Sequence, residues 1–346
     1  MHKLTAPLFA LALAMPLARA HAAPLSRAEA VVFRASAPDA LTKKVCSATK
    51  SKLRASASCR DKAAYVKSNE LDHDLWRPYL RGLGGAYVGV GSDQGLTFVA
   101  WQRAELAWLI DYDPRVVRFN RVTRALVLAA PDIARFRRMW QKQGKRAAVA
   151  AIRAACARSA STSAAAACRR QLIGSYLDYR ETLRRHYALV ARLGRGGRRM
   201  HWLHDASDYT FVRRMFREGR VRILGGDLLG PHALLGIGAT ARRMKVAVRA
   251  LYLSNAEEFW RYTPRFRRNM RALPMDARSI VLRTRHNKRR AEGGRKFFYV
   301  VQSGVDFQRR LAEPRTVGVW SLLGRRLQKR SAPRGVLTLG LATKSR

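Results

Sequence analysis

Short apolar runs alternate with helix-forming segments through most of the chain. The runs are poor in charged residues and cover positions 86–90, 106–110, 221–224, 246–253 and 279–283. Such runs are typical of parallel strands that helices cover on both faces. A sixth run at 297–301 follows a basic loop, which favours an antiparallel hairpin with the fifth run. The pattern predicts an α/β fold with about five parallel strands and one antiparallel strand.

The first apolar run leads into a glycine turn. Gly89 and Gly91 let the backbone adopt positive φ angles and approach a ligand closely. The second run ends in Asp111, which follows Gly91 at about the 20-residue spacing that places an acid beside a ribose. Asp113 and Pro114 then form a strong helix start, because Asp caps the first N–H groups and Pro fits the first helical position. The stretch therefore predicts the first half of a nucleotide-binding fold.

These residues resemble class I S-adenosylmethionine-dependent methyltransferases, in which a glycine turn such as GVG follows the first strand and a run such as LIDYDP ends the second. YVGVGSDQ, DYDP, GGDLLG and LYLSNAEEFW together are similar to an uncharacterised bacterial family with leptospiral members. The resemblance spans roughly Tyr87 to Phe307. It implies a Rossmann-like, methyltransferase-type sheet, mostly parallel with one antiparallel strand, plus a helical insertion. Two positions depart from the methyltransferase turn: Tyr87 replaces its usual acid, and Asp93 its third glycine.

The resemblance also implies a site for S-adenosylmethionine. Its cofactor-binding residues would be Gly89, Gly91, Asp93, Gln94, Asp111 and Asp227. Asp111 would bind the ribose and Asp227 the base, although Asp227 would alternatively cap the next helix. Ser254 and Asn255 end the fourth strand, where methyltransferases orient the methyl acceptor. Asn255 would alternatively cap the helix that follows it.

The chain divides into four expected regions. These are a signal peptide at 1–22, a basic helical extension at 23–83, the α/β domain at 84–313 and a basic tail at 314–346. Within the domain, residues from about 121 to 205 are almost continuously helical in character. One helix joins the second and third strands in a plain methyltransferase-like fold, so we expect a helical insertion here that forms a cap.

The first residues have the features of a secretory signal. Lys3 gives a positive start, residues 6–15 are apolar, and small residues follow at 18–22. The apolar stretch is shorter than the roughly 20 residues that a membrane-spanning helix needs. We therefore expect cleavage, export to the periplasm, the cell surface or the medium, and no transmembrane span afterwards.

The four cysteines agree with an oxidising compartment. They form two close pairs in the sequence, Cys46 with Cys59 and Cys156 with Cys168. Four cysteines allow three pairings, of which we favour the local one because it closes two short loops. A zinc site is disfavoured, since the cysteines form no C-x-x-C motif and have no neighbouring histidine pair.

An H-x-x-H-D run at His201, His204 and Asp205 raises a second question about metal binding. Residues three apart share a helix face, but this segment is not clearly helical and its third ligand is uncertain. We favour a structural role for these residues and expect no metal.

The charge of the chain is unusual. Its 346 residues include 68 Lys and Arg but only 23 Asp and Glu, for a net charge of +45. Such a field attracts polyanions such as nucleic acid, acidic glycans or anionic lipid. A genome that favours Arg would explain the preference for Arg over Lys, but not the shortage of acids. The 48% of hydrophobic residues are enough for a sizeable core.

Two functions fit these observations. The first is an exported methyltransferase-like protein that binds S-adenosylmethionine or a related nucleoside. Because the donor is made in the cytoplasm, this fold would alternatively have lost or changed its cofactor. The second is a non-catalytic envelope protein whose Arg-rich surfaces bind anionic glycan, lipid or nucleic acid. A hydrolase is disfavoured, since G-x-S-x-G, H-E-x-x-H and G-x-x-x-x-G-K are absent from the sequence. Convergence of Asp93, Asp111 and Asp227 on one open cleft would support the first function. Arginine side chains that fill this cleft would support the second function.

Overall fold

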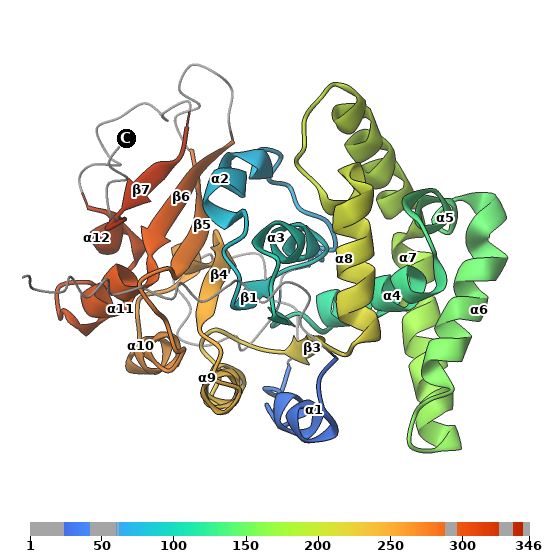
Figure 1. The fold of residues 1–346 in the computed structure, drawn as a ribbon, viewed down its shortest axis with the longest axis horizontal. Coiled ribbons are helices and arrows are strands. Elements are labelled where there is room, and N and C mark those ends of the chain that lie inside the picture. The colour runs from blue at the N-terminus through green and yellow to red at the C-terminus, as the bar shows by residue number, and fades with distance from the viewer. Residues whose placement is uncertain (1–23, 42–59, 61, 288–295, 325–334, 342–346) are drawn as a thin grey trace, which may run out of the picture.

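Figure 1 shows the computed structural model of the chain. The structure describes residues 24–41, 60, 62–287, 296–324 and 335–341. The expected signal peptide and the expected pair of Cys46 and Cys59 lie outside these residues. Among the described residues, no helix combines the length and apolar character that a membrane crossing requires.

A single seven-stranded sheet forms the centre of the fold, in the order β3-β2-β1-β4-β5-β6-β7. The strands are β1 (Ala86–Val90), β2 (Leu106–Asp111), β3 (Val221–Gly225), β4 (Val248–Ser254), β5 (Ile280–His286), β6 (Phe297–Ser303) and β7 (Leu337–Leu339). Strands β1 to β5 are parallel, and β6 is antiparallel to β5. The predicted α/β sheet, mostly parallel with one antiparallel pair, is confirmed. Strand β7, which pairs parallel to β6, lies in the segment that we expected to be a tail.

Helices cover both faces of this sheet (Figure 1). One apolar core contains residues of α2 (Arg77–Leu80), α3 (Gln94–Gln102), α4 (Pro114–Ala129) and α8 (Ala206–Arg217). The other contains residues of α1 (Arg27–Arg34), α9 (Ala233–Arg243), α10 (Pro264–Arg271), α11 (Gly304–Ala312) and α12 (Val319–Leu323). Successive residues of a strand point to opposite faces, so a strand that is covered on both faces carries apolar side chains at most of its positions. This is why the strands were visible as continuous apolar runs.

The helical segment between α4 and α8 stands beside the sheet (Figure 1). It includes α5 (Ile133–Arg138), α6 (Lys145–Cys156) and α7 (Thr162–Arg195), and α7 packs against α4 and α6. A disulfide bond joins Cys156 to Cys168, as the local pairing predicted. Ser161 caps the start of α7 by accepting a hydrogen bond from the Ala164 N–H.

The order of the strands reverses beside β1. The chain passes from β1 through β2 to β3 on one side, then returns to place β4 on the other side of β1. In open α/β sheets, ligands bind in the crevice outside the carboxyl ends of the strands at such a reversal. We therefore expect a ligand crevice at the carboxyl ends of β1, β2 and β4.

Candidate cofactor cavity

A cavity of 280 Å³ lies at this carboxyl edge. The five parallel strands each contribute a residue at or just beyond their ends: Gly91, Asp111, Asp227, Ser254 and His286. Of the residues implied by the methyltransferase resemblance, Gln94 and Asn255 also line the cavity. Segments far apart in the sequence thus meet at one place.

The first two strand ends are joined by a hydrogen bond. The N–H of Gly91 donates to Asp111 Oδ2 at 3.0 Å, and the N–H of Asp113 donates to Asp111 Oδ1 at 2.8 Å. Gly91 has a φ of 95°, a conformation that glycine adopts without strain. Burial raises the pKa of Asp111 to about 7, although these backbone hydrogen bonds oppose the shift. Each carboxylate oxygen keeps a second lone pair that can accept a hydroxyl of a ligand.

The third strand end is held by an acid from the N-terminal extension. The carboxylate of Asp39 accepts hydrogen bonds from the N–H groups of Asp227, His232 and Ala233, at 2.8 to 3.2 Å. Asp39, not Asp227, therefore caps α9. Asp227 instead makes a tight turn by accepting from the Leu229 N–H at 2.9 Å, and α9 begins six residues later at Ala233.

A buried carboxylate organises the fourth strand end. Glu70 accepts hydrogen bonds from the hydroxyls of Tyr252, Ser254 and Thr284 at 2.7, 2.7 and 2.6 Å. Ser254 has a φ of 51°, a strained conformation for a residue other than glycine. Burial alone would raise the pKa of Glu70, but the hydrogen bond and charge of His73, together with hydrogen bonds from Thr284 and Tyr252, outweigh burial and lower it. Glu70 is therefore an anion behind two hydroxyls that line the cavity.

A histidine and a glutamate lie at the fifth strand end. His286 Nδ1 is 2.7 Å from Glu258 Oε2, and Arg285 Nε donates to Glu258 Oε1 at 2.6 Å. Glu258 can only accept here, so His286 carries its proton on Nδ1 when neutral and keeps a lone pair on Nε2. Asn255 Nδ2 lies 3.1 Å from the same His286 nitrogen. The side chain of Asn255 makes no capping hydrogen bond to η4 (Ala256–Phe259).

Two residues implied for the cofactor site do not line the cavity. A Cβ at Gly89 would come within 2.0 Å of the Tyr87 hydroxyl, so Gly89 makes room for the side chain that replaces the methyltransferase acid. Asp93 is fully buried, and its Oδ2 lies 3.2 Å from His201 Nε2. Asp93 therefore belongs to a different cluster, although it sits in the same turn.

The H-x-x-H-D run does not converge on one point. His204 Nε2 lies 2.7 Å from the carbonyl oxygen of Val190, and its Nδ1 accepts from the Met200 N–H. Asp205 caps α8 by accepting from the Ser207 N–H at 2.8 Å. Only His201 faces another potential ligand.

Sequence reasoning missed Glu70, Asp39 and Glu258 with His286 as organising groups. Glu70 and Asp39 lie in the extension that was expected to be peripheral. Their contacts join residues separated by 182 positions for Tyr252 and Glu70 and by 188 for Asp227 and Asp39. The scarcity of acids was the available signal. In a chain with so few of them, an isolated acid in a basic segment is a candidate for a buried, structural position.

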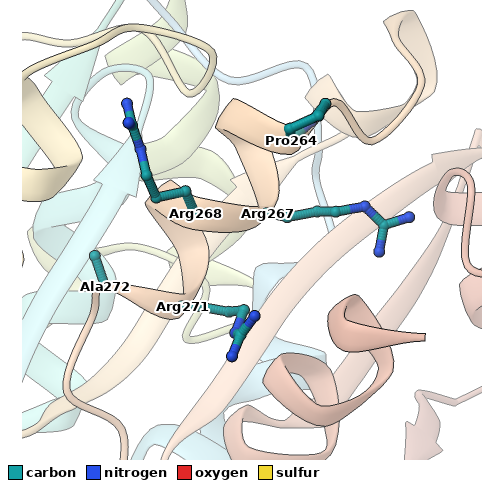
Figure 2. A pocket seen from close by; sticks show the side chains of 5 residues that line it. All are labelled: Pro264, Arg267, Arg268, Arg271 and Ala272. Carbon is teal, nitrogen blue, oxygen red and sulfur yellow. The ribbon is translucent and has the colours of Figure 1, made fainter. Parts of the chain in front are cut away.

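Two other hollows have a different character. One of 540 Å³ lies along α10, where the side chains of Arg267, Arg268 and Arg271 point in different directions (Figure 2). Arg267 is already engaged with the carbonyl oxygens of Tyr262, Leu311, Glu313 and Thr316. The other, of 850 Å³, lies at the amino ends of the strands. Its arginines include three paired with acids: Arg103 with Asp208, Arg220 with Glu218, and Arg249 with Asp276.

Comparison with known proteins gives a family. The profile described as "Domain of unknown function (DUF7790)" matches residues 65–340. The chain belongs to this family. The DUF7790 region contains all seven strands and begins with Tyr65, which is the first residue of the cavity lining. It includes Glu70 and excludes Asp39. No curated protein matches the chain.

The raised pKa of Asp111 predicts a pH dependence of stability. Asp111 has a pKa of about 7 in the folded chain and about 3.9 in an unfolded one. The folded state therefore binds more protons between these values, so the contribution of Asp111 to the free energy of unfolding falls as pH rises from about 4 to about 7. The fall is at most about 4 kcal/mol. Urea unfolding across this range should show it in the wild type but not in Asp111→Asn. Parallel pH profiles for the two proteins would contradict the prediction.

Proposed function

We propose that this cavity binds S-adenosylmethionine or a related nucleoside. The observation that carries the proposal is the meeting of polar groups from five parallel strand ends at the reversal of strand order. The cavity volume of 280 Å³ lies just below the range of roughly 300–1,000 Å³ that is typical of ligand cavities. Within the described residues, the lining contains Lys67 and Lys296 but no arginine. Of the three acids of the expected site, Asp111 and Asp227 line the cavity, whereas Asp93 does not.

The three parts of the ligand fit different strand ends. Asp111 would accept the two ribose hydroxyls, because its carboxylate retains lone pairs beside the turn. Asp227 would accept from the base, with Leu228 and Leu229 as apolar lining. Gly91 and Gln94 would lie beside the amino-acid part of the ligand.

Glu70 gives the cavity a preference for a cation. Tyr252 and Ser254 donate their hydroxyl protons to Glu70, so toward a ligand their oxygens can only accept. The negative charge behind them and the aromatic ring of Tyr252 both favour a positive group. The sulfonium of S-adenosylmethionine is such a group, whereas the thioether of S-adenosylhomocysteine is neutral.

His286 would serve a methyl acceptor. In methyl transfer the acceptor oxygen or nitrogen attacks the methyl carbon, and the carbon–sulfur bond breaks to leave a neutral thioether. The acceptor then loses a proton, which His286 Nε2 would take while Glu258 holds the ring. Positioning of donor and acceptor supplies the rest of the catalysis. Ser254 and Asn255 would orient the acceptor from the neighbouring strand end.

The net charge of +45 supports a second candidate, a non-catalytic envelope protein that binds an anionic polymer. Export to the periplasm, the cell surface or the medium is part of both proposals. An exported chain does not ordinarily meet S-adenosylmethionine. The first test is therefore of ligand binding, before any test of turnover.

Calorimetry tests the proposed site directly. We expect S-adenosylmethionine and S-adenosylhomocysteine to bind one per chain. Asp111→Ala should weaken both at least about tenfold, because two charge-assisted hydrogen bonds are lost. Asp178→Ala is the matched control, since Asp178 is an exposed acid of α7. Failure to bind, or binding equally tight in Asp111→Ala, would refute the site. Salt-dependent binding of any polyanion would then support the second candidate.

Glu70→Gln separates the charge of Glu70 from its hydrogen bonds. With the amide oxygen in the place of Oε1, it can still accept from the Ser254 and Thr284 hydroxyls, and the amide nitrogen can donate to the Tyr252 oxygen, but the negative charge is gone. We expect affinity for S-adenosylmethionine to fall about tenfold more than affinity for S-adenosylhomocysteine, because only the former carries a positive charge. Each ligand is the control for the other within the same variant. An equal loss for both would show that Glu70 acts only on the structure of the site.

A further inference from the structure

A second polar cluster lies beside the glycine turn, outside the cavity lining. It comprises Asp93 at the start of α3, His186 on α7 and His201, which precedes η3 (Trp202–His204). The three residues are 0%, 8% and 4% exposed. One ligand atom from each lies within 4.8 Å of the others, and Asp93 Oδ2 is 3.2 Å from His201 Nε2. The cluster joins a loop of the sheet to the helical segment that follows α4.

From this arrangement we propose that Asp93, His186 and His201 bind a divalent transition-metal ion. Two imidazoles and one carboxylate form a ligand set for Zn²⁺ or Fe²⁺. Neighbouring ligands around a tetrahedral ion lie about 3.4 Å apart when each is about 2.1 Å from it. The closest observed pair already has nearly this spacing. A modest inward movement of the third ligand would complete the set.

Some buried polar atoms of the cluster are incompletely hydrogen-bonded, which favours a bound ion. The buried Tyr187 hydroxyl interacts with the Asp93 carboxylate, but neither this hydroxyl nor Asp93 Oδ1 reaches full hydrogen-bond geometry within the described residues. No hydrogen bond joins His186 to another described residue, although its ring contacts Tyr187 and His201. A buried carboxylate with an unsatisfied oxygen is costly, and a cation would remove that cost.

His201 shows what metal binding must change. Its Nδ1 accepts from the Leu203 N–H at 3.2 Å, so the neutral ring carries its proton on Nε2 and directs it at Asp93. A metal ion at Nε2 takes the place of this proton. The proton then moves to Nδ1, and the contact with Leu203 opens. Metal binding therefore includes a local shift at the start of η3.

Such an ion would tie the glycine turn to α7. Asp93 is two residues from Gly91 and adjacent to Gln94, which both line the cavity. An ion bound by Asp93 and His186 would fix the turn against the helical segment, and would stabilise the folded chain by mass action. This inference is independent of the proposed cofactor.

Cobalt provides a spectroscopic test. The full chain, stripped with a chelator, is titrated with Co²⁺ and then with Zn²⁺. The visible absorption of bound Co²⁺ reports its coordination, and thermal unfolding reports its effect on stability. We expect the wild type to bind one Co²⁺ more per chain than His186→Ala, to lose the absorption when Zn²⁺ is added, and to melt at a higher temperature with metal.

His204→Ala is the matched control, because both ring nitrogens of His204 already contact the backbone. It should bind as many ions as the wild type. Circular dichroism checks the fold of each variant. Should His186→Ala fail to fold, Asp93→Asn replaces it, since the amide oxygen can still accept from His201. Equal binding by the wild type and the folded ligand variant, or no uptake of either ion, would overturn the proposal and leave a buried polar cluster that holds water.

Discussion

The hydrogen bond from the Gly91 N–H to the Asp111 carboxylate fixes the geometry on which the rest of the carboxyl edge depends. It joins residues 20 positions apart and locks the turn after β1 to the end of β2. Asn120, on α4, holds the same turn by donating to the Gly91 carbonyl oxygen at 2.9 Å. The turn then presents two sides. Gly91 and Gln94 line the cavity, whereas Asp93 faces His201 and the helical segment.

Buried acids organise a chain whose overall charge is strongly positive. Glu70 gathers the hydroxyls of β4 and β5, Asp39 caps α9, and Glu257 pairs with the fully buried Arg283 at 2.6 Å. Each of these carboxylates would be costly inside the protein without its partners. The net charge of +45 reflects the many cations that have no acid available to pair with them.

The first six strands could be predicted from the sequence because strands buried on both faces leave continuous apolar runs, and their class and directions are confirmed, whereas β7 lies in a segment that we expected to be a tail. The spacing from Gly91 to Asp111 predicts an acid beside a ribose, and the structure brings the two residues together through the hydrogen bond from the Gly91 N–H. Periodicity carries no information about pairing between distant segments, so it could not reveal that Glu70 reaches β4 or that Asp39 caps α9. Likewise, Asp93 was assigned by its place in a motif, whereas its contact with His201, 108 positions away, decides where it points.

A crystal structure of the chain with saturating S-adenosylhomocysteine tests the central claim most directly. We expect one ligand in the cavity, with both ribose hydroxyls within hydrogen-bonding distance of Asp111 and the base beside Asp227. We also expect the hydrogen bond between Gly91 and Asp111 to be retained, because the ligand uses the remaining lone pairs of the carboxylate. A ligand bound elsewhere, or an empty cavity in a crystal grown at saturating ligand, would contradict the assignment of the carboxyl edge as a cofactor site.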